Sequence, residues 1–91
     1  MNKFEKENPV LLADGLEDAF IGSVYSIKFG INLAVYDIDK CVEILVKRDG
    51  MSEEEADEFL QFNTFCAWVG EGTPLFLERK TLGDFNAELE Q

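Results

Sequence analysis

The sequence predicts a small α+β domain in which an antiparallel sheet packs against a helical hairpin, with the element order β-β-β-α-α-β. Three observations lead to this prediction. The chain has 91 residues, which fits one hydrophobic core and no second domain. Residues 19–27 alternate at period two, as a half-buried strand does. After Asp37 the apolar positions change to helical spacing and keep it for two consecutive segments.

The domain itself is expected to span residues 10–78. Residues 1–9 are polar and end at Pro9, so we interpret them as a flexible N-terminal arm. Residues 79–91 form a polar tail with scattered large apolar residues, and this tail either forms a weak helix or stays mobile.

Four short runs rich in aliphatic and aromatic residues supply the strands: 10–13, 19–27, 33–36 and 75–78. Asp14 and Gly15 end the first run as a turn, because glycine tolerates positive φ and aspartate bonds its own backbone. Gly22, inside the second run, indicates a bulge or a close approach of another backbone. Gly70 and Gly72 belong to the turn that precedes the last run.

The first helix is predicted over residues 38–48. Asp37 can accept hydrogen bonds from the free N–H groups at its start, and Gly50 suits the left-handed C-cap at its end. Its apolar side chains share one face: Ile38, Cys41, Val42, Leu45 and Val46.

The second helix is predicted over residues 53–66, close enough to the first to form a hairpin. Ser52 and Glu55 have the spacing of a capping box, in which each side chain bonds the other residue's backbone N–H. Asn63 falls on the apolar stripe of this helix. It is therefore predicted to be a buried amide that anchors the glycine-containing turn.

Both the sheet and the two helices contribute to the expected core. Its members are Phe20, Val24, Val35, Leu75 and Leu77 from the sheet, and Val42, Leu45, Phe59 and Leu60 from the helices. Cys41 and Cys66 are expected to be reduced, buried thiols; a disulfide between them is the alternative if the two helices face each other. The net stability of such a core is on the order of 5 kcal/mol.

Composition excludes several kinds of chemistry. The chain has 19 acidic and 8 basic residues, a formal net charge of -11 and no histidine. Catalytic triads that use histidine and histidine-ligated metal sites are therefore excluded. Direct binding to nucleic acid is not expected, because its affinity comes from lysine and arginine. We expect no cofactor and no metal. The N-terminal sequence lacks the apolar segment of a secretory signal, and no stretch suits a membrane, so a cytoplasmic location is expected.

The strongest unusual feature is a segment without basic residues between Arg48 and Arg79. Acidic side chains concentrate in the first two turns of the second helix. One interpretation is a solvated helix face that serves solubility; the other is a surface that imitates nucleic-acid phosphates and binds a basic protein. The candidate partner-binding residues are Glu53, Glu54, Asp57, Glu58, Trp68 and Glu71.

Two other hypotheses remain open. Asp14 with Asp18, or Asp37 with Asp39, could serve a carboxylate-based metal or small-molecule enzyme, although Val42 stands where an EF-hand loop starting at Asp37 needs glycine. The third hypothesis is an oligomer-forming module, in which exposed aromatic side chains form a self-complementary patch: Phe29, Trp68 and Phe76.

Several short motifs together resemble a family of short uncharacterised proteins found in phage, prophage and bacterial genomes. The motifs cover residues 11–77 and include Ala13-Asp14-Gly15, Val35-Tyr36-Asp37, Arg48-Asp49-Gly50-Met51, Phe62-Asn63 and Trp68-Val69-Gly70-Glu71-Gly72-Thr73-Pro74. The resemblance implies a small intracellular protein and assigns no activity. Together with the charge it leads to the expectation of a non-enzymatic protein that inhibits a basic, nucleic-acid-handling host or defence protein.

Overall fold

The computed structural model describes residues 10–65 and 70–90. The expected arm over residues 1–9, and the predicted positions of Cys66 and Trp68, lie outside this part of the chain. In chain order the elements are η1 (Glu17–Ala19), β1 (Phe20–Ser26), β2 (Ile31–Asp37), α2 (Ile38–Asp49), α3 (Glu53–Leu60), η2 (Gln61–Phe65), β3 (Leu75–Leu77) and α4 (Leu82–Leu89).

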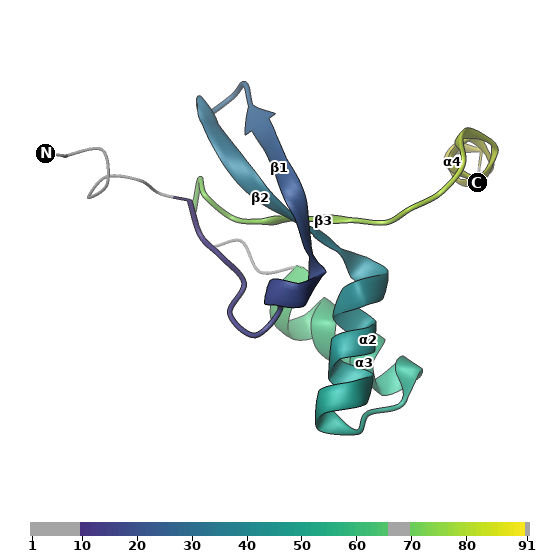
Figure 1. The fold of residues 1–91 in the computed structure, drawn as a ribbon. Helices are drawn as coiled ribbons and strands as arrows, with labels where there is room; N and C mark the ends of the chain where they lie inside the picture. The colour runs from purple at the N-terminus through teal and green to yellow at the C-terminus, as the bar shows by residue number, and fades with distance from the viewer. Residues whose placement is uncertain (1–9, 66–69, 91) are drawn as a thin grey trace, which may run out of the picture.

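The α+β class is confirmed: a three-stranded sheet in the order β1-β2-β3 is combined with a hairpin of α2 and α3 (Figure 1). Two details of the prediction are corrected. β2 and β3 pair in parallel, so the sheet is mixed, because a helical connection returns the chain to the starting edge before the next strand. Residues 10–13 lie outside the sheet, and Leu11 N donates one hydrogen bond to Gly72 O at 3.1 Å.

The predicted irregularity at Gly22 is confirmed. β1 and β2 pair antiparallel, and their register shifts between Phe20 and Gly22. Gly22 has a φ of +150°, which side chains rarely adopt, so this bulge requires glycine. The bulge lets Phe20 remain opposite Tyr36 while the rest of β1 stays in register with β2.

Both helix starts form as the sequence predicts. Asp37 Oδ1 accepts a hydrogen bond from Lys40 N at 3.1 Å, and Gly50 ends α2 with a φ of +72°. At α3, Ser52 Oγ accepts from Glu55 N at 3.1 Å while Glu55 Oε1 accepts from Ser52 N at 2.9 Å. This reciprocal pair satisfies two backbone donors that the helix itself leaves free.

Removing the α3 cap should weaken the whole domain. Ser52→Ala is expected to lower the free energy of unfolding by about 1 kcal/mol, because α3 packs in the core and loses its N-cap acceptor. Urea denaturation followed by circular dichroism measures the change. Thr81→Ala is the matched control: Thr81 caps α4, which has no buried residue, so this variant should unfold at the wild-type midpoint. Equal losses in both variants would contradict the prediction.

The predicted second helix changes geometry part-way. The α-helix ends at Leu60 and continues as a π-helical turn, η2, through Phe65. This wider turn shifts the phase of the apolar stripe. The prediction for Asn63 is therefore wrong: its side chain is exposed and donates from Nδ2 to Phe59 O at 2.9 Å, within the same helix.

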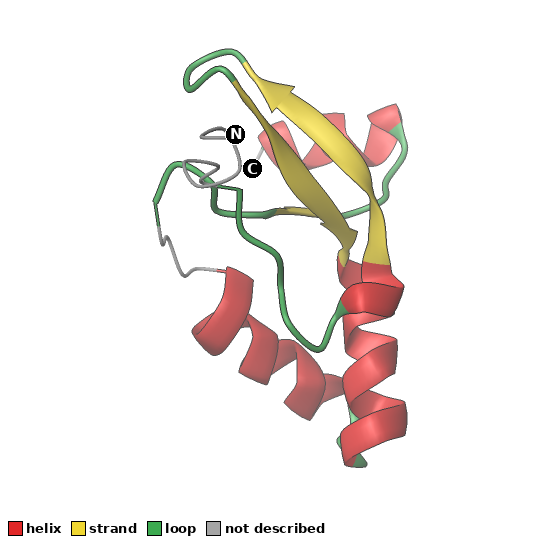
Figure 2. Ribbon diagram, turned by 60° about the vertical axis from the view of Figure 1, so that its left-hand side comes forward, coloured by secondary structure: helices red, strands yellow, loops and turns green. Residues whose placement is uncertain are grey.

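The core lies where one face of the sheet meets α2 and α3. Its buried members are Leu16, Ala19, Ala34, Tyr36, Cys41, Leu45, Ala56 and Leu60. The predicted burial of Val35, Cys41, Leu45 and Leu60 is confirmed. Five other predicted core residues are exposed instead: Phe20, Val24, Phe59, Leu75 and Leu77. The β1–β2 hairpin extends beyond the helices, so they cover only part of it (Figure 2).

Tyr36 connects the sheet to the segment before it. Its ring meets the ring of Phe20 edge-on and stacks on that of Phe76, each at a centroid distance of 5.7 Å. Its hydroxyl oxygen accepts a hydrogen bond from Ala13 N at 2.9 Å. This fully buried tyrosine therefore holds residues 10–13 against the sheet, although they form no strand.

The predicted turns occupy their expected places. Asp14 and Gly15 form a turn, and the Gly15 carbonyl accepts a hydrogen bond from Arg48 Nη1 at 2.8 Å. Before β3, the Gly70 carbonyl accepts from both Thr73 N and Thr73 Oγ1, at 3.2 and 2.7 Å.

Candidate protein-binding surface

The carboxylates of α3 gather on its outer side because of helical spacing. Ala56 and Leu60 turn inward and are buried. Glu53 and Asp57 are four residues apart, as are Glu54 and Glu58, so the two pairs form neighbouring rows on the helix surface. The side chains are exposed at 53, 54 and 58 and half-buried at 57. We call this set the acidic face: Glu53, Glu54, Asp57 and Glu58.

The acidic face has no described cation bound to it. The ion pairs among residues 10–65 and 70–90 join Arg48 to Asp49, Arg79 to Asp37, and Lys80 to both Glu78 and Glu88. None of them reaches α3. The negative charge of the acidic face is therefore not neutralised by another described part of the chain, and it acts on the solvent and on any approaching partner.

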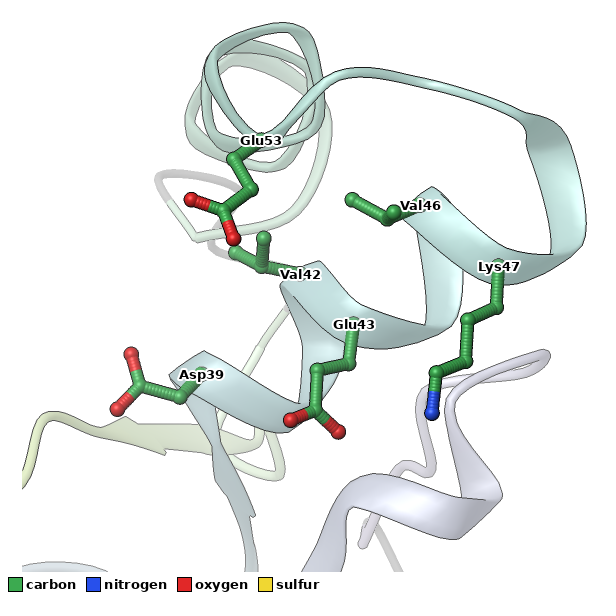
Figure 3. A pocket seen from close by; sticks show the side chains of 6 residues that line it. All are labelled: Asp39, Val42, Glu43, Val46, Lys47 and Glu53. Atoms are coloured by element: carbon green, nitrogen blue, oxygen red, sulfur yellow. The ribbon is translucent and has the colours of Figure 1, made fainter.

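Two hollows border the acidic face. One, of about 400 Å³, lies between α2 and α3 and is lined by Asp39, Val42, Glu43, Val46, Lys47 and Glu53. Figure 3 shows its two valines between the helices, with Glu53 on one side and the charged side chains of α2 on the other. The second hollow, of about 480 Å³, is lined by residues of the same helix and its cap: Ser52, Glu54, Glu55, Asp57 and Glu58.

An apolar hollow continues this surface, and the sequence interpretation missed it. Met51, Phe59 and Phe62 line it together with Glu55 and Glu58, in a volume of about 370 Å³. Phe62 is among the most exposed large apolar side chains of the described residues. Glu55, Glu58, Phe59 and Phe62 stand at helical spacing, so their shared face could have been found in the sequence, but periodicity does not show that no other element covers this face.

The remaining candidate partner residues are not brought to α3 by any described contact. Glu71 is exposed in the turn that precedes β3, away from the residues that line the hollows beside α3. Trp68 lies outside the described residues. The structure therefore unites four of the six candidates, all on one helix.

Asp37, one of the carboxylates of the enzyme hypothesis, is bound by other parts of the chain. Both oxygens of Asp37 are engaged, one by Lys40 N and the other by Arg79 Nε. Within the described ranges, no three potential ligands of the His, Cys, Asp or Glu type form a metal-binding group. Burial, followed by the charge of Asp37, raises the pKa of the Cys41 thiol to about 11, so this thiol stays protonated near neutral pH.

The Asp37–Arg79 pair is a further feature that the sequence interpretation missed. Asp37 is buried, whereas the Arg79 side chain is 61% exposed and reaches the carboxylate from the segment after β3. Burial raises the pKa of Asp37. The hydrogen bond from the Lys40 backbone and the interaction with Arg79 together lower this pKa by more than burial raises it, so the pKa of Asp37 lies below its ordinary value.

The aromatic patch of the oligomer hypothesis does not form as expected. Phe29 and Phe76 are half-buried, and the ring of Phe76 stacks on Tyr36 in the interior of the sheet. The prediction that these two aromatic side chains form an exposed patch is therefore wrong.

Comparisons with known proteins assign the chain to no family. No protein-family model matches the chain, and neither the curated proteins nor the solved structures searched contain a match. The resemblance to the phage and bacterial family thus stays a prediction. Among the described helices, none has the length and apolar character that crossing a membrane requires.

Proposed function

We propose that this chain is a non-enzymatic protein that binds the basic surface of a partner protein through the acidic face of α3. One observation carries the proposal: four carboxylates occupy neighbouring rows of one helix, and no described cation pairs with them. In such an arrangement the fields of the carboxylates add, which speeds encounter with a positive surface and disfavours negative ones.

The charge density supports a partner that handles nucleic acid. The six residues 53 to 58 take up about 9 Å of the helix axis, so the four carboxylates of the acidic face present roughly one charge per 2.3 Å. Duplex DNA carries one negative charge per about 1.7 Å of its axis. A groove that is lined with lysine and arginine to hold phosphates would meet a similar density on α3, and the chain would then act as an inhibitor. We place this action in the cytoplasm of a bacterial or phage-infected cell.

Reversing the acidic face should abolish partner capture. The chain, immobilised, is used to capture proteins from bacterial lysate, and mass spectrometry identifies them. Glu54→Lys combined with Asp57→Lys and Glu58→Lys is expected to lose the captured nucleic-acid-handling protein, because attraction becomes repulsion at the contact. Duplex DNA added to the wild-type experiment should compete for the same partner, and about 0.5 M salt should release it.

The control carries the same change in net charge at other exposed sites: Asp14→Lys, Asp18→Lys and Glu90→Lys. This variant should capture the partner nearly as well as the wild type. Circular dichroism confirms that both variants are folded. Capture that survives reversal of the acidic face, or that is lost equally in both variants, would refute the proposed function.

A further inference from the structure

The last helix, α4, presents an apolar stripe that no described part of the chain covers. Leu82, Phe85 and Leu89 lie on one side of the helix at helical spacing, and between 47% and 74% of each is exposed. No residue of α4 is buried. A helix of eight residues is marginal in water without a packing partner. The helix should therefore be more stable when an apolar surface covers this stripe.

The sheet has such a surface on the side that turns away from the core. Because side chains alternate along a strand and paired residues share a face, Val24, Leu75 and Leu77 lie on the same side. Tyr36 and Phe76 lie on the opposite side, which packs against the core. Between 42% and 48% of each of the first three side chains is exposed, whereas Leu33 and Val35, on the same side of the central strand β2, are buried.

Two ionic contacts hold α4 away from the sheet of its own chain. Arg79 Nε donates to the buried Asp37 at the start of α2, which fixes the segment just after β3. Lys80 Nζ then binds both Glu78 and Glu88, and so ties α4 to that segment. Accordingly, α4 stands apart from the sheet at the end of an extended segment (Figure 1).

We propose that two copies of this chain exchange their α4 helices, so that the stripe of each copy covers the outward sheet face of the other. The area decides in favour of a reciprocal exchange. With about 200 Å² taken as the upper value for each residue, the exposed parts of the six side chains amount to at most roughly 600 Å² in one complete docking. Two complete dockings bury up to about 1,200 Å², which is where specific, stable interfaces begin. A single docking falls below this size.

The dimer leaves the acidic face free, since none of the six side chains belongs to α3. It is therefore independent of the proposed function. Each copy carries a formal net charge of -11, and two such copies repel each other. Higher salt should strengthen the dimer by screening this repulsion, whereas it weakens binding to a basic partner.

The test measures molar mass by light scattering after size exclusion, with the full chain at about 0.15 M salt and at protein concentrations up to about 200 μM. The wild type is expected at twice its chain mass of 10.3 kDa. Leu82→Glu combined with Leu89→Glu should be monomeric, since it places charge on the stripe. Ile27→Glu is the matched control, because Ile27 is equally apolar and even more exposed but lies in the β1–β2 turn. This variant should remain dimeric.

A second variant tests the sheet side of the contact. Val24→Glu should also be monomeric, and Val24 is half-exposed, so the fold should tolerate the change. If this variant stays dimeric while the α4 variant does not, two α4 helices pack on each other and the exchange is refuted. A wild-type chain that remains monomeric over the whole concentration range, or a dimer that survives the α4 substitutions, likewise overturns the proposal.

Discussion

Leu60→Ala is expected to remove most of the stability of the domain. Leu60 ends α3 with only 1% of its surface exposed, and it packs in the core beside Ala56 and Tyr36. Truncating a fully buried leucine costs about 2–5 kcal/mol, because transfer energy is lost and a cavity remains. A domain of this size has a total stability on the order of 5 kcal/mol, so a large fraction of the variant should be unfolded at 37 °C.

Urea denaturation at 25 °C, followed by far-ultraviolet circular dichroism, measures this loss. Leu12→Ala is the matched control, since the same atoms are removed from a largely exposed side chain outside the sheet and helices. Its free energy of unfolding should lie within about 0.5 kcal/mol of the wild-type value. If Leu60→Ala lowered the free energy of unfolding no more than Leu12→Ala does, α3 would not be part of the cooperative core.

Arg79→Met is expected to destabilise the domain through Asp37. The substitution leaves a buried carboxylate that only backbone N–H groups such as that of Lys40 still contact, in a place that is costly for an unpaired charge. We expect a loss of about 2 kcal/mol at pH 7. This is less than the value for a fully buried pair, because the Arg79 side chain is largely exposed and its attraction is screened.

A double-mutant cycle isolates this effect. Asp37→Asn keeps an oxygen that can cap α2 but carries no charge that needs compensation. In that background Arg79→Met should cost only a few tenths of a kcal/mol. A full loss in the Asp37→Asn background would show that Arg79 stabilises the domain by packing and not by its charge.

The pH dependence of this pair has a definite sign. The pKa of Asp37 is lower in the folded chain than in the unfolded chain, so the unfolded state binds more protons at low pH. The stability from Asp37 is therefore fully present above the unfolded pKa of about 3.9 and is lost as pH falls through the folded pKa. In Arg79→Met the rise that burial causes in the pKa of Asp37 is opposed by fewer groups, so this pKa is higher than in the wild type. The difference in stability between wild type and variant should consequently shrink as the pH is lowered below about 4.

The parts of the fold that depend on neighbouring residues were predictable from the sequence. Ser52 and Glu55 satisfy each other's backbone groups across three residues, and Gly50 alone accounts for the left-handed end of α2. The acidic face was predictable for the same reason, because the spacing of Glu53 and Asp57 already places them on one side of a helix.

The parts that depend on distant residues were not predictable. Phe20 and Leu77 have the sequence pattern of core residues, but they lie on the two outer strands of the sheet, and Leu77 faces away from the core, so they remain exposed. Asn63 was misplaced because the widening of α3 after Leu60 has no recognisable local signal. Arg79 lies 42 residues from Asp37, and nothing near either residue in the sequence indicates their contact.

The parallel pairing of β2 with β3 has a consequence for the order in which the chain folds. Residues 27–30 connect β1 to β2 and residues 50–52 connect α2 to α3, so both units can form early at a small entropic cost. Val35 can meet Leu75 only after the whole helical hairpin has brought the chain back. The third strand should therefore be the last to join, and closing this long loop should limit the folding rate.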